Sequence, residues 1–304
     1  MTPPPARQAG ETADWTRTVL ESACAEVGLD ASGAALAKFT NNAVYNLATS
    51  PITVRISGST AIRQRVGKVI TVARWLARHE APAVRLVDDL PQPLHMGEHA
   101  ITFWHTVTLA AAPASPPNGV DLGEILRHLH GLPPPADPLP LWNPLQAITQ
   151  RVREEQVLGP ADHQFLLDTI EELSEDLASI EPTLPLGPIH GDAFTGNLIK
   201  SQTGAVICDF DGAAYGPREW DLAPVAVGHL RMDYTTNFHQ QVVDTYGIDV
   251  TTWSGFPILR RLREFQLVTS VLPVLSANPS LYEQWRHRFT SFQRKDDTRW
   301  SPYT

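Results

Sequence analysis

The first third of the chain changes its hydrophobic period twice. Apolar residues fall at helical spacing over residues 14–27, and Gly28 marks the end of the helix that this spacing predicts. Short apolar runs separated by Asn-Asn and Ser-Pro turn signals then indicate strands. A second helical stretch follows, and strand-like runs return after it. The predicted strands cover residues 34–40, 43–50, 52–57, 83–87 and 99–108, and the second predicted helix covers residues 61–79.

The remainder of the chain is mainly helical in pattern. A Pro-rich break in composition, AAPASPPN, predicts a hinge at residues 111–118. Asp121 is expected to cap the helix that follows it. Helical spacing covers residues 121–130, 162–180 and most of the chain from Trp220 onwards, whereas residues 186–215 are predicted to form short strands and loops.

These patterns predict an α+β protein built from two lobes. The N-lobe, residues 1–108, is small and rich in strands, and the C-lobe, residues 109–304, is larger and mainly helical. Within the N-lobe, the Pro- and Gly-rich residues 1–12 are expected to be disordered.

Composition narrows the classes of function. Hydrophobic residues make up 42% of the 304 and charged residues 19%, which suits a chain with a substantial core. Lys and Arg total 24 against 33 Asp and Glu, so the net charge of −9 disfavours nucleic-acid binding, which needs a basic surface. The two cysteines, Cys24 and Cys208, offer neither a disulfide framework nor a zinc site. Because the sequence lacks a signal peptide and a membrane-spanning apolar run, we expect a soluble cytoplasmic protein with no membrane partner.

The strongest chemical signal lies between residues 189 and 211. His190, Asp192 and Asn197 follow the pattern H-x-D-x4-N, and an apolar strand then ends in Asp-Phe-Asp at residues 209–211. A carboxylate on a loop can accept a proton from a hydroxyl group, and Asn and Asp side chains offer the hard oxygen ligands that Mg²⁺ prefers. Chance would give roughly 0.02 matches to the first pattern in such a chain. The two patterns together predict general-base and metal chemistry.

These motifs resemble those of the aminoglycoside phosphotransferase family. A further match is the segment GPREWDLA at residues 216–223, which is similar to the family's G-x-x-x-x-D-L-A. The resemblance is strongest over residues 187–223 and extends more loosely over most of residues 38–230. It implies a two-lobed, protein-kinase-like fold and a small-molecule kinase that moves the γ-phosphoryl group of ATP or GTP to a hydroxyl group with the help of Mg²⁺.

The resemblance also implies roles for individual residues of the catalytic loop. Asp192 would be the catalytic base, and Asn197 and Asp209 would hold the metal ions. His190 would brace the loop, and Asp221 would tie it to the following helix. Two roles stay open for Asp211: it is either a second carboxylate near the metal or a solvated turn residue.

The nucleotide would be bound from the predicted N-lobe. Arg55 falls where the family has a Lys or Arg that reaches the phosphates from the third strand, and a guanidinium can bind phosphate oxygens bidentately. The turn formed by Asn41 and Asn42 could contact phosphate through backbone N–H and side-chain groups. The adenine would lie against the hinge backbone near Phe103, Trp104 and His105. The sequence has neither a G-x-G-x-x-G nor a P-loop motif.

The sequence departs from the family at the helix predicted for residues 61–79. The family usually pairs its phosphate-binding Lys or Arg with a Glu from this helix, and alignment puts Val69 at that position. No acidic residue occurs between Ile52 and His79. Either a carboxylate from elsewhere holds Arg55, or nucleotide binding is weaker or different. The apolar spacing of the helix favours a buried position for Val69.

The acceptor is left open by the sequence. A polycationic aminoglycoside, whose modification would confer antibiotic resistance, needs several carboxylates near the site, and a choline-type acceptor needs an aromatic cage. Homoserine, a sugar or another metabolite would also suit, and a nucleotide-binding pseudokinase without catalysis is the alternative from another class. The oligomeric state is open too. The candidate carboxylates are Asp211, Glu219, Asp233, Asp244, Glu264 and Glu283, and the candidate cage residues are Tyr234, Trp253 and Trp285.

Overall fold

The computed structural model describes residues 9–39, 42–58, 63–111, 115–276 and 278–303. The chain divides into two compact units, each of which is made from three separate segments of the sequence. Disorder was expected over residues 1–12; residues 1–8 lie outside the described residues, and residues 9–12 instead form the start of the first helix, which begins at Ala9. The first unit contains residues 1–117, 131–139 and 196–213, and the second contains residues 118–130, 140–195 and 214–304.

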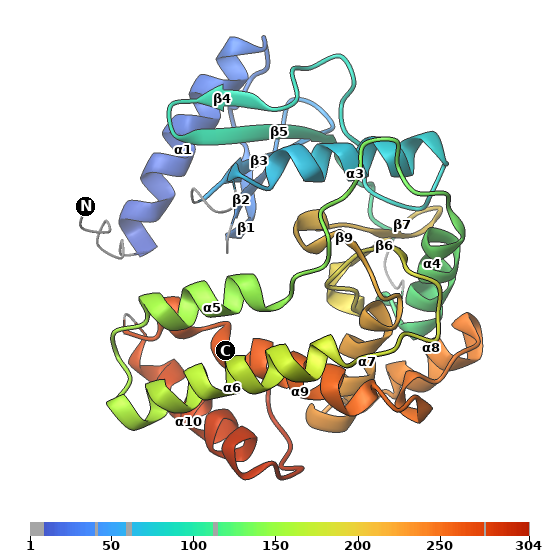
Figure 1. Ribbon diagram of the computed structural model, residues 1–304. Helices are drawn as coiled ribbons and strands as arrows, with labels where there is room; N and C mark the ends of the chain where they lie inside the picture. The colour runs from blue at the N-terminus through green and yellow to red at the C-terminus, as the bar shows by residue number, and fades with distance from the viewer. Residues whose placement is uncertain (1–8, 40–41, 59–62, 112–114, 277, 304) are drawn as a thin grey trace. The chain divides into compact units, whose positions relative to one another are not determined.

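The first unit is built on a five-stranded antiparallel sheet with the strand order β1-β2-β3-β5-β4. Helix α1 runs along one face of this sheet (Figure 1). A separate hairpin, β7-β8, follows later in the chain and leads into the short helix η2. The elements are α1 (Ala9–Glu26), β1 (Ala35–Phe39), β2 (Asn42–Asn46), β3 (Ile52–Ser57), α3 (Val66–Arg78), β4 (Leu94–Met96), β5 (His99–His105), β7 (Leu198–Ser201), β8 (Gly204–Ile207) and η2 (Phe210–Gly212).

The register of the sheet separates an apolar face from a polar one. Apolar residues of the three central strands lie opposite one another and pack against Leu20 and Cys24 of α1. Successive residues of a strand point to opposite faces, so Asn42 and Arg55 project from the other face of the sheet. The register therefore places the largely buried side chain of Arg55 on the face of the sheet opposite the apolar core. The cross-strand rows of the apolar face are Ala43, Ile56 and Ile101, and Tyr45, Val54 and Phe103.

Helix α3 is amphipathic, and its apolar stripe includes the position at which the family has a glutamate. Val69 is 1% exposed and belongs to that stripe. Exposed residues such as Arg74 and Ala77 occupy the opposite side. The helix therefore cannot supply a carboxylate from position 69 without burying a charge. The stripe consists of Val66, Val69, Ile70, Val72, Ala73, Trp75 and Leu76.

The second unit is mainly helical, with its core between the helices. One small sheet, β6-β9, joins the segment before His190 to the segment before α7. Figure 1 shows α5, α6, α9 and α10 packed together as yellow-green to red ribbons. The elements are α4 (Gly119–Gly131), α5 (Leu145–Glu154), α6 (Pro160–Ala178), β6 (Gly187–Ile189), η1 (Thr195–Asn197), β9 (Ala214–Gly216), α7 (Glu219–Arg231), α8 (Phe238–Tyr246), η3 (Val250–Thr252), α9 (Phe256–Thr269), η4 (Leu272–Val274) and α10 (Pro279–Arg294); η1 crosses into the first unit at Gly196.

A large part of the core of the second unit is one cluster of aromatic and aliphatic side chains. It includes Trp220 of α7, Phe265 of α9 and Trp285 of α10, which are almost completely buried. Aromatic rings stack within it, for example Phe265 on Phe292 with ring centroids 5.5 Å apart. Across the described residues, no helix is both long enough and apolar enough to pass through a lipid bilayer.

The structure also corrects two sequence predictions, one in each unit. Residues 83–87 do not form a strand, because Ala83 bridges to β8 and Leu86 bridges to β5, so that the segment crosses between two sheets. The cap of α4 is Asn118 rather than Asp121. The Asn118 Oδ1 accepts hydrogen bonds from the N–H groups of Val120 (2.9 Å) and Asp121 (3.1 Å), and Asp121 accepts one from the Asn118 N–H in return.

Val69→Glu should destabilise the protein, because its carboxylate would be buried in the apolar stripe of α3. We expect a loss of about 3 kcal/mol or more, which lowers the thermal midpoint by several degrees. Ala77→Glu adds the same carboxylate at an exposed position of the same helix and should change the midpoint by less than a degree or two. Equal midpoints for the two variants in a thermal melt would contradict this account of position 69.

Candidate active site

The segment after β8 holds two carboxylates in a tight turn. Asp209 has a backbone φ of 68°, in the left-handed region, and Phe210 behind it is buried. The left-handed region costs a non-glycine residue about 1 kcal/mol or more, although Asp tolerates it better than most. Phe210 anchors the turn by packing near Trp104, with ring centroids 6.4 Å apart. The turn therefore presents Asp209 and Asp211 on either side of a fixed aromatic residue.

Arg55 is held by the second of these carboxylates. Its guanidinium forms an ion pair and a hydrogen bond with Asp211, and its Nη2 lies 4.0 Å from Asp209 Oδ1. The side chains of Arg55 and Asp211 are only 13% and 15% exposed. Asn42 completes the contact, since in the amide orientation that satisfies both groups its oxygen accepts from Arg55 Nη2 at 2.7 Å. The partner that α3 does not supply comes from the turn after β8.

Helix α3 contributes a second cation to the same place. Lys68 lies next to Val69 in the sequence and donates from Nζ to the backbone oxygen of Asp211 at 2.7 Å. Burial, helped by the nearby charge of Arg65, lowers the pKa of Lys68 to about 8, although Asp211 acts in the opposite direction. Asn42, Arg55, Lys68, Asp209 and Asp211 form one group, called here the Arg55 cluster. Where the family has an acid on this helix, the chain has a base.

Asn197 lies beside the first carboxylate of the cluster. It is 3% exposed, and its backbone oxygen accepts from Cys208 N at 2.9 Å and from Cys208 Sγ at 3.3 Å. These bonds fix the backbone of Asn197 to Cys208, the residue directly before Asp209. Burial raises the pKa of the Cys208 thiol to about 11, so it stays protonated at neutral pH and serves as a hydrogen-bond donor rather than as a nucleophile.

The Asn197 and Asp209 pair fits a magnesium ion that shares its ligands with a substrate. Among the described residues, no three His, Cys, Asp or Glu side chains gather as a metal cluster. Mg²⁺ commonly takes only one or two carboxylates from a protein and completes its shell with phosphate oxygens and water. An amide oxygen and a carboxylate next to two cations are therefore a donor set for a metal–phosphate complex rather than for a free metal.

In the second unit, the loop after β6 is fixed by the buried carboxylate of Asp221. Asp221 lies in the first turn of α7 and accepts hydrogen bonds from His190 N and Gly191 N, each at 2.7 Å. Its Oδ2 is also 3.1 Å from His130 Nε2. His190 in turn holds Asp192, two residues further on, because the Nδ1 of His190 accepts a hydrogen bond from the backbone N–H of Asp192 at 3.3 Å. The backbone of Asp192 is thus positioned by two buried side chains.

The carboxylate of Asp192 meets a cation that the sequence did not reveal. Arg263, from helix α9, places Nη1 at 2.8 Å from Asp192 Oδ1. The Asp192 side chain is 41% exposed, whereas that of Arg263 is 14% exposed. No motif marks Arg263, because it lies on a helix far along the chain and reaches the loop only through the packing of α9 against α7.

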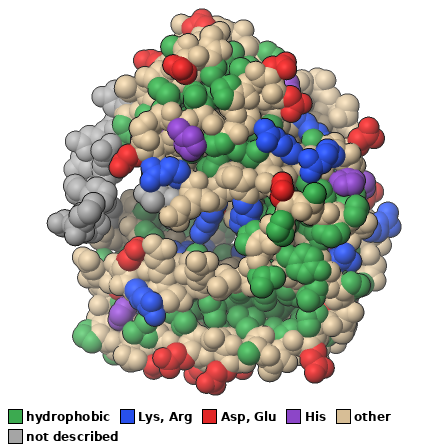
Figure 2. Space-filling view, turned by 45° about the horizontal axis from the view of Figure 1, so that its top comes forward, with side chains coloured by type: hydrophobic (Ala, Val, Ile, Leu, Met, Phe, Trp, Pro, Cys, Tyr) green, Lys and Arg blue, Asp and Glu red, His purple; other side chains and the backbone are tan. Residues whose placement is uncertain are grey.

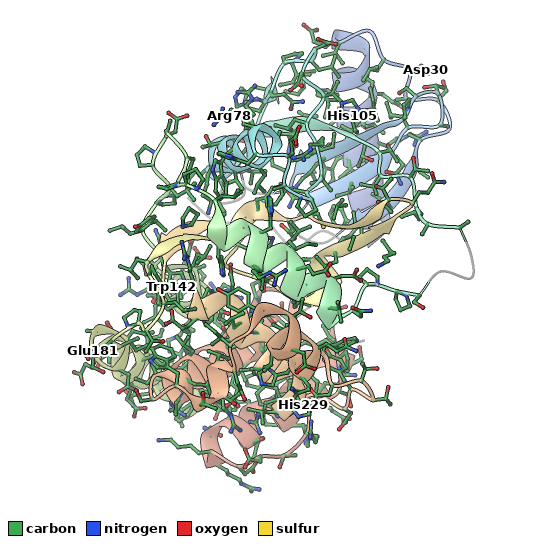
Figure 3. The ribbon with its side chains drawn as sticks, turned by 90° about the vertical axis from the view of Figure 1, so that its right-hand side faces the viewer. Asp30, Arg78, His105, Trp142, Glu181 and His229 are labelled. Carbon is green, nitrogen blue, oxygen red and sulfur yellow. The ribbon has the colours of Figure 1, made fainter. Side chains whose placement is uncertain are left out.

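The residues expected near the adenine lie on β5. Phe103 and Trp104 are buried, whereas His105, labelled in Figure 3, is exposed. The N–H of Phe103 donates to Gln92 Oε1 at 3.2 Å, and that of His105 donates to Arg85 O at 2.9 Å. Their role toward a nucleotide stays a prediction. Asn41, expected to contact phosphate, lies outside the described residues.

Comparison with known proteins places this site in a family. The phosphotransferase enzyme family matches residues 35–265, which is more than half of the chain. The chain belongs to this family. It is accordingly a small-molecule kinase whose acceptor is a hydroxyl group, and the family predicted from the motifs at residues 187–223 is confirmed. Comparison with curated proteins finds no match.

Solved structures share the fold of this kinase at low sequence identity. An amicoumacin kinase in complex with AMP-PNP, Ca²⁺ and Ami has a TM-score of 0.71 and 13% identity, covering 95% of this chain and 98% of that one. A choline/ethanolamine kinase family protein from Mesorhizobium loti has a TM-score of 0.62 and 18% identity, covering 93% and 94%. A spectinomycin phosphotransferase in complex with ADP and spectinomycin has a TM-score of 0.58 and 16% identity, covering 91% and 93%. The predicted two-lobed, protein-kinase-like α+β fold is thereby confirmed.

Lys68 should make nucleotide affinity depend on pH. The free protein loses this proton near pH 8, and a bound phosphate would retain it, so binding above pH 8 requires proton uptake. We expect the ATP affinity measured by calorimetry to be flat near pH 7 and to fall by up to tenfold per pH unit above about pH 8. Lys68→Arg keeps its charge and should remove the fall. A wild-type profile as flat as that of Lys68→Arg would exclude Lys68 from phosphate binding.

Proposed function

We propose that this kinase transfers the γ-phosphoryl group of ATP or GTP to a hydroxyl group of a small molecule, with Mg²⁺ as its metal ion. The observation that carries the proposal is the Arg55 cluster, in which two cations and two carboxylates meet beside Asn197. Phosphoryl transfer has a loose transition state, so catalysis consists mainly of positioning and charge neutralisation. A cluster of this composition is suited to that task.

In this proposal the first unit binds the phosphates and the metal. Arg55 and Lys68 donate to phosphate oxygens, and Asp209 and Asn197 ligate the metal. When bound, Mg²⁺ neutralises the charge on the phosphates. Asp211 holds Arg55 in place, and it does so from the same turn that carries Asp209. The absence of a glutamate on α3, taken by itself, would favour a pseudokinase. The ion pair between Arg55 and Asp211 compensates for that absence.

Asp192 acts on the acceptor in this proposal. Its carboxylate orients the acceptor hydroxyl group and receives the proton late in the reaction, as expected for a loose transition state. His190 and Asp221 support it by fixing the loop backbone. The buried ring of His190 is a bracing group, because its Nδ1 is occupied by the N–H of Asp192.

Asp192→Asn tests the base. The substitution preserves the shape of the side chain but removes the proton acceptor, so kcat should fall by about a hundredfold or more while ATP affinity stays within a few-fold. Asp176→Asn, at an exposed position of α6, is the matched control and should leave turnover unchanged. An acceptor that Asp192→Asn still phosphorylates at a near-normal rate would remove Asp192 from this role.

The metal ligands differ in the charge that they contribute. Asp209→Ala removes a full charge and should abolish nucleotide-dependent turnover, whereas Asn197→Ala removes a neutral oxygen and should leave an activity that added Mg²⁺ partly restores. ADP release is the measurement, and Asp176→Ala at an exposed position of α6 is the control. Turnover that survives EDTA would contradict metal-dependent phosphoryl transfer.

A further inference from the structure

The second unit contains a pocket beside the residues that follow Asp192. It has a volume of about 150 Å³ and is lined mostly by apolar and aromatic side chains. An apolar cavity of roughly this volume can hold a benzene molecule, so the pocket has room for one ring-sized group. No Asp or Glu is among its lining residues in the described part of the chain. The lining includes Gly228, His229, Tyr234, Phe238 and Arg263.

Arg263 is the fixed charge of this pocket. Both interactions that the structure gives its guanidinium leave from Nη1, to Asp192 Oδ1 at 2.8 Å and to Gln266 Oε1 at 3.1 Å. The edge formed by Nε and Nη2 meets no acceptor among the described residues. Five N–H donors in a planar fork make a guanidinium edge a bidentate partner for a carboxylate. Because Arg263 lines the pocket, this edge is a candidate anion-binding group beside an apolar lining.

The rest of the lining adds aromatic surface rather than negative charge. Tyr234 is 48% exposed and lies edge-on to Phe238, with ring centroids 6.3 Å apart. The ring of His229, labelled in Figure 3 near the end of α7, stacks on that of His239, with ring centroids 6.2 Å apart. The nearby acid Asp249 lies behind this pair, where its Oδ1 is 3.1 Å from His239 Nε2. An aromatic or aliphatic group would find matching surface here.

Three of the six acidic side chains that could receive a polycation are engaged elsewhere, and the other three, Asp233, Asp244 and Glu283, are exposed and do not line the pocket. Asp211 pairs with Arg55, and Glu264 pairs with Arg231 and Arg260. Glu219 is 1% exposed and accepts hydrogen bonds from the loop at residues 183–184. Figure 2 shows acidic side chains scattered over the face in view rather than gathered in one patch. Trp285, one of the aromatic cage candidates, is completely buried. The net negative charge is therefore not directed into this pocket.

We propose that the pocket is the acceptor subsite, and that it takes a small hydroxylated molecule carrying a carboxylate and a ring-sized apolar group. The carboxylate binds the Nε–Nη2 edge of Arg263, the apolar group fills the pocket, and the hydroxyl group lies at Asp192. This rests on the proposed function, because it assumes that Asp192 receives the acceptor. Arg263 thereby serves both partners, holding Asp192 through Nη1 and the acceptor through its other edge.

A matched set of probes tests the charge preference. The probes are 3-hydroxy-2-phenylpropanoate, its neutral amide, the amine 3-amino-2-phenylpropan-1-ol, and kanamycin as a polycation. Their affinities for the full chain are measured by calorimetry without nucleotide, so that binding is read independently of turnover. We expect the carboxylate to bind about ten- to a hundredfold more tightly than the amide, and the amine and kanamycin to bind more weakly still.

Variants of Arg263 identify the group responsible. Arg263→Gln should abolish the preference for the carboxylate, Arg263→Lys should retain part of it, and Arg261→Gln on the same helix should retain all of it, because Arg261 pairs with Glu172 away from the pocket. Thermal melts check that each variant folds. If Arg263→Gln unfolds, Gly228→Leu gives a second test. A Cβ at Gly228 lies 3.4 Å from the Tyr234 ring, so the longer side chain should fill the pocket and abolish binding while Arg263 is intact.

The outcomes separate this inference from the proposed function. Equal or tighter binding of the amine or kanamycin, a carboxylate preference that survives in Arg263→Gln, or no binding of any probe would overturn the acceptor subsite. So would an increased turnover of neutral acceptors by Arg263→Gln, since that would make the ion pair with Asp192 an inhibitory contact. Carboxylate binding through Arg263 with no acceptor-stimulated ADP release would leave the binding site standing and contradict the proposed function.

Discussion

The pairing of Arg55 with Asp211 is the interaction on which the arrangement of the first unit depends. The register of the sheet directs the Arg55 guanidinium onto the polar face, where its side chain is largely buried. A buried guanidinium needs a carboxylate, because an uncompensated charge there costs several kcal/mol. Helix α3 cannot supply one, since Val69 belongs to its apolar stripe. The turn after β8 must therefore lie against β3, and its shape follows from that requirement.

Because the carboxylate that pairs with Arg55 comes from the turn after β8, phosphate binding is coupled to that turn rather than to helix α3. A glutamate on α3 would tie the phosphate-binding cation to the position of a helix. Here the cation is tied to the residue two positions after Asp209, the proposed metal ligand. A displacement of the turn would move the metal ligand and release the guanidinium together. Lys68 strengthens the same link, because it donates to the backbone oxygen of Asp211 from α3. Phosphate binding and metal binding are thus expected to be lost together rather than one at a time.

The sequence was sufficient for features that depend on local pattern and failed for those set by distant contacts. Short apolar runs indicated the strand that carries Arg55, and the apolar spacing of α3 indicated the burial of Val69, whereas Asn42, expected in a turn, is the first residue of β2. Spacing alone could not show that residues 83–87 cross between two sheets, since their strand-like composition suits either sheet. The partners of Arg55 and Asp192 were equally hidden, because each comes from an element remote in the sequence.

The same distinction separates the two halves of the proposed reaction. The donor side relies on Asn197, the Asp-Phe-Asp turn and the two cations beside it, which one hairpin, the neighbouring strands and helix α3 supply. The acceptor side relies on helices α7 and α9, whose contacts are set by core packing around Trp220 and Phe265. Apart from Arg263, which pairs with Asp192, a substitution on the pocket side of these helices alters the acceptor site without disturbing the motif residues. Phosphoryl-transfer chemistry can therefore stay constant in a chain whose acceptor is chosen by the residues that line one pocket, and in this chain those residues include a single guanidinium.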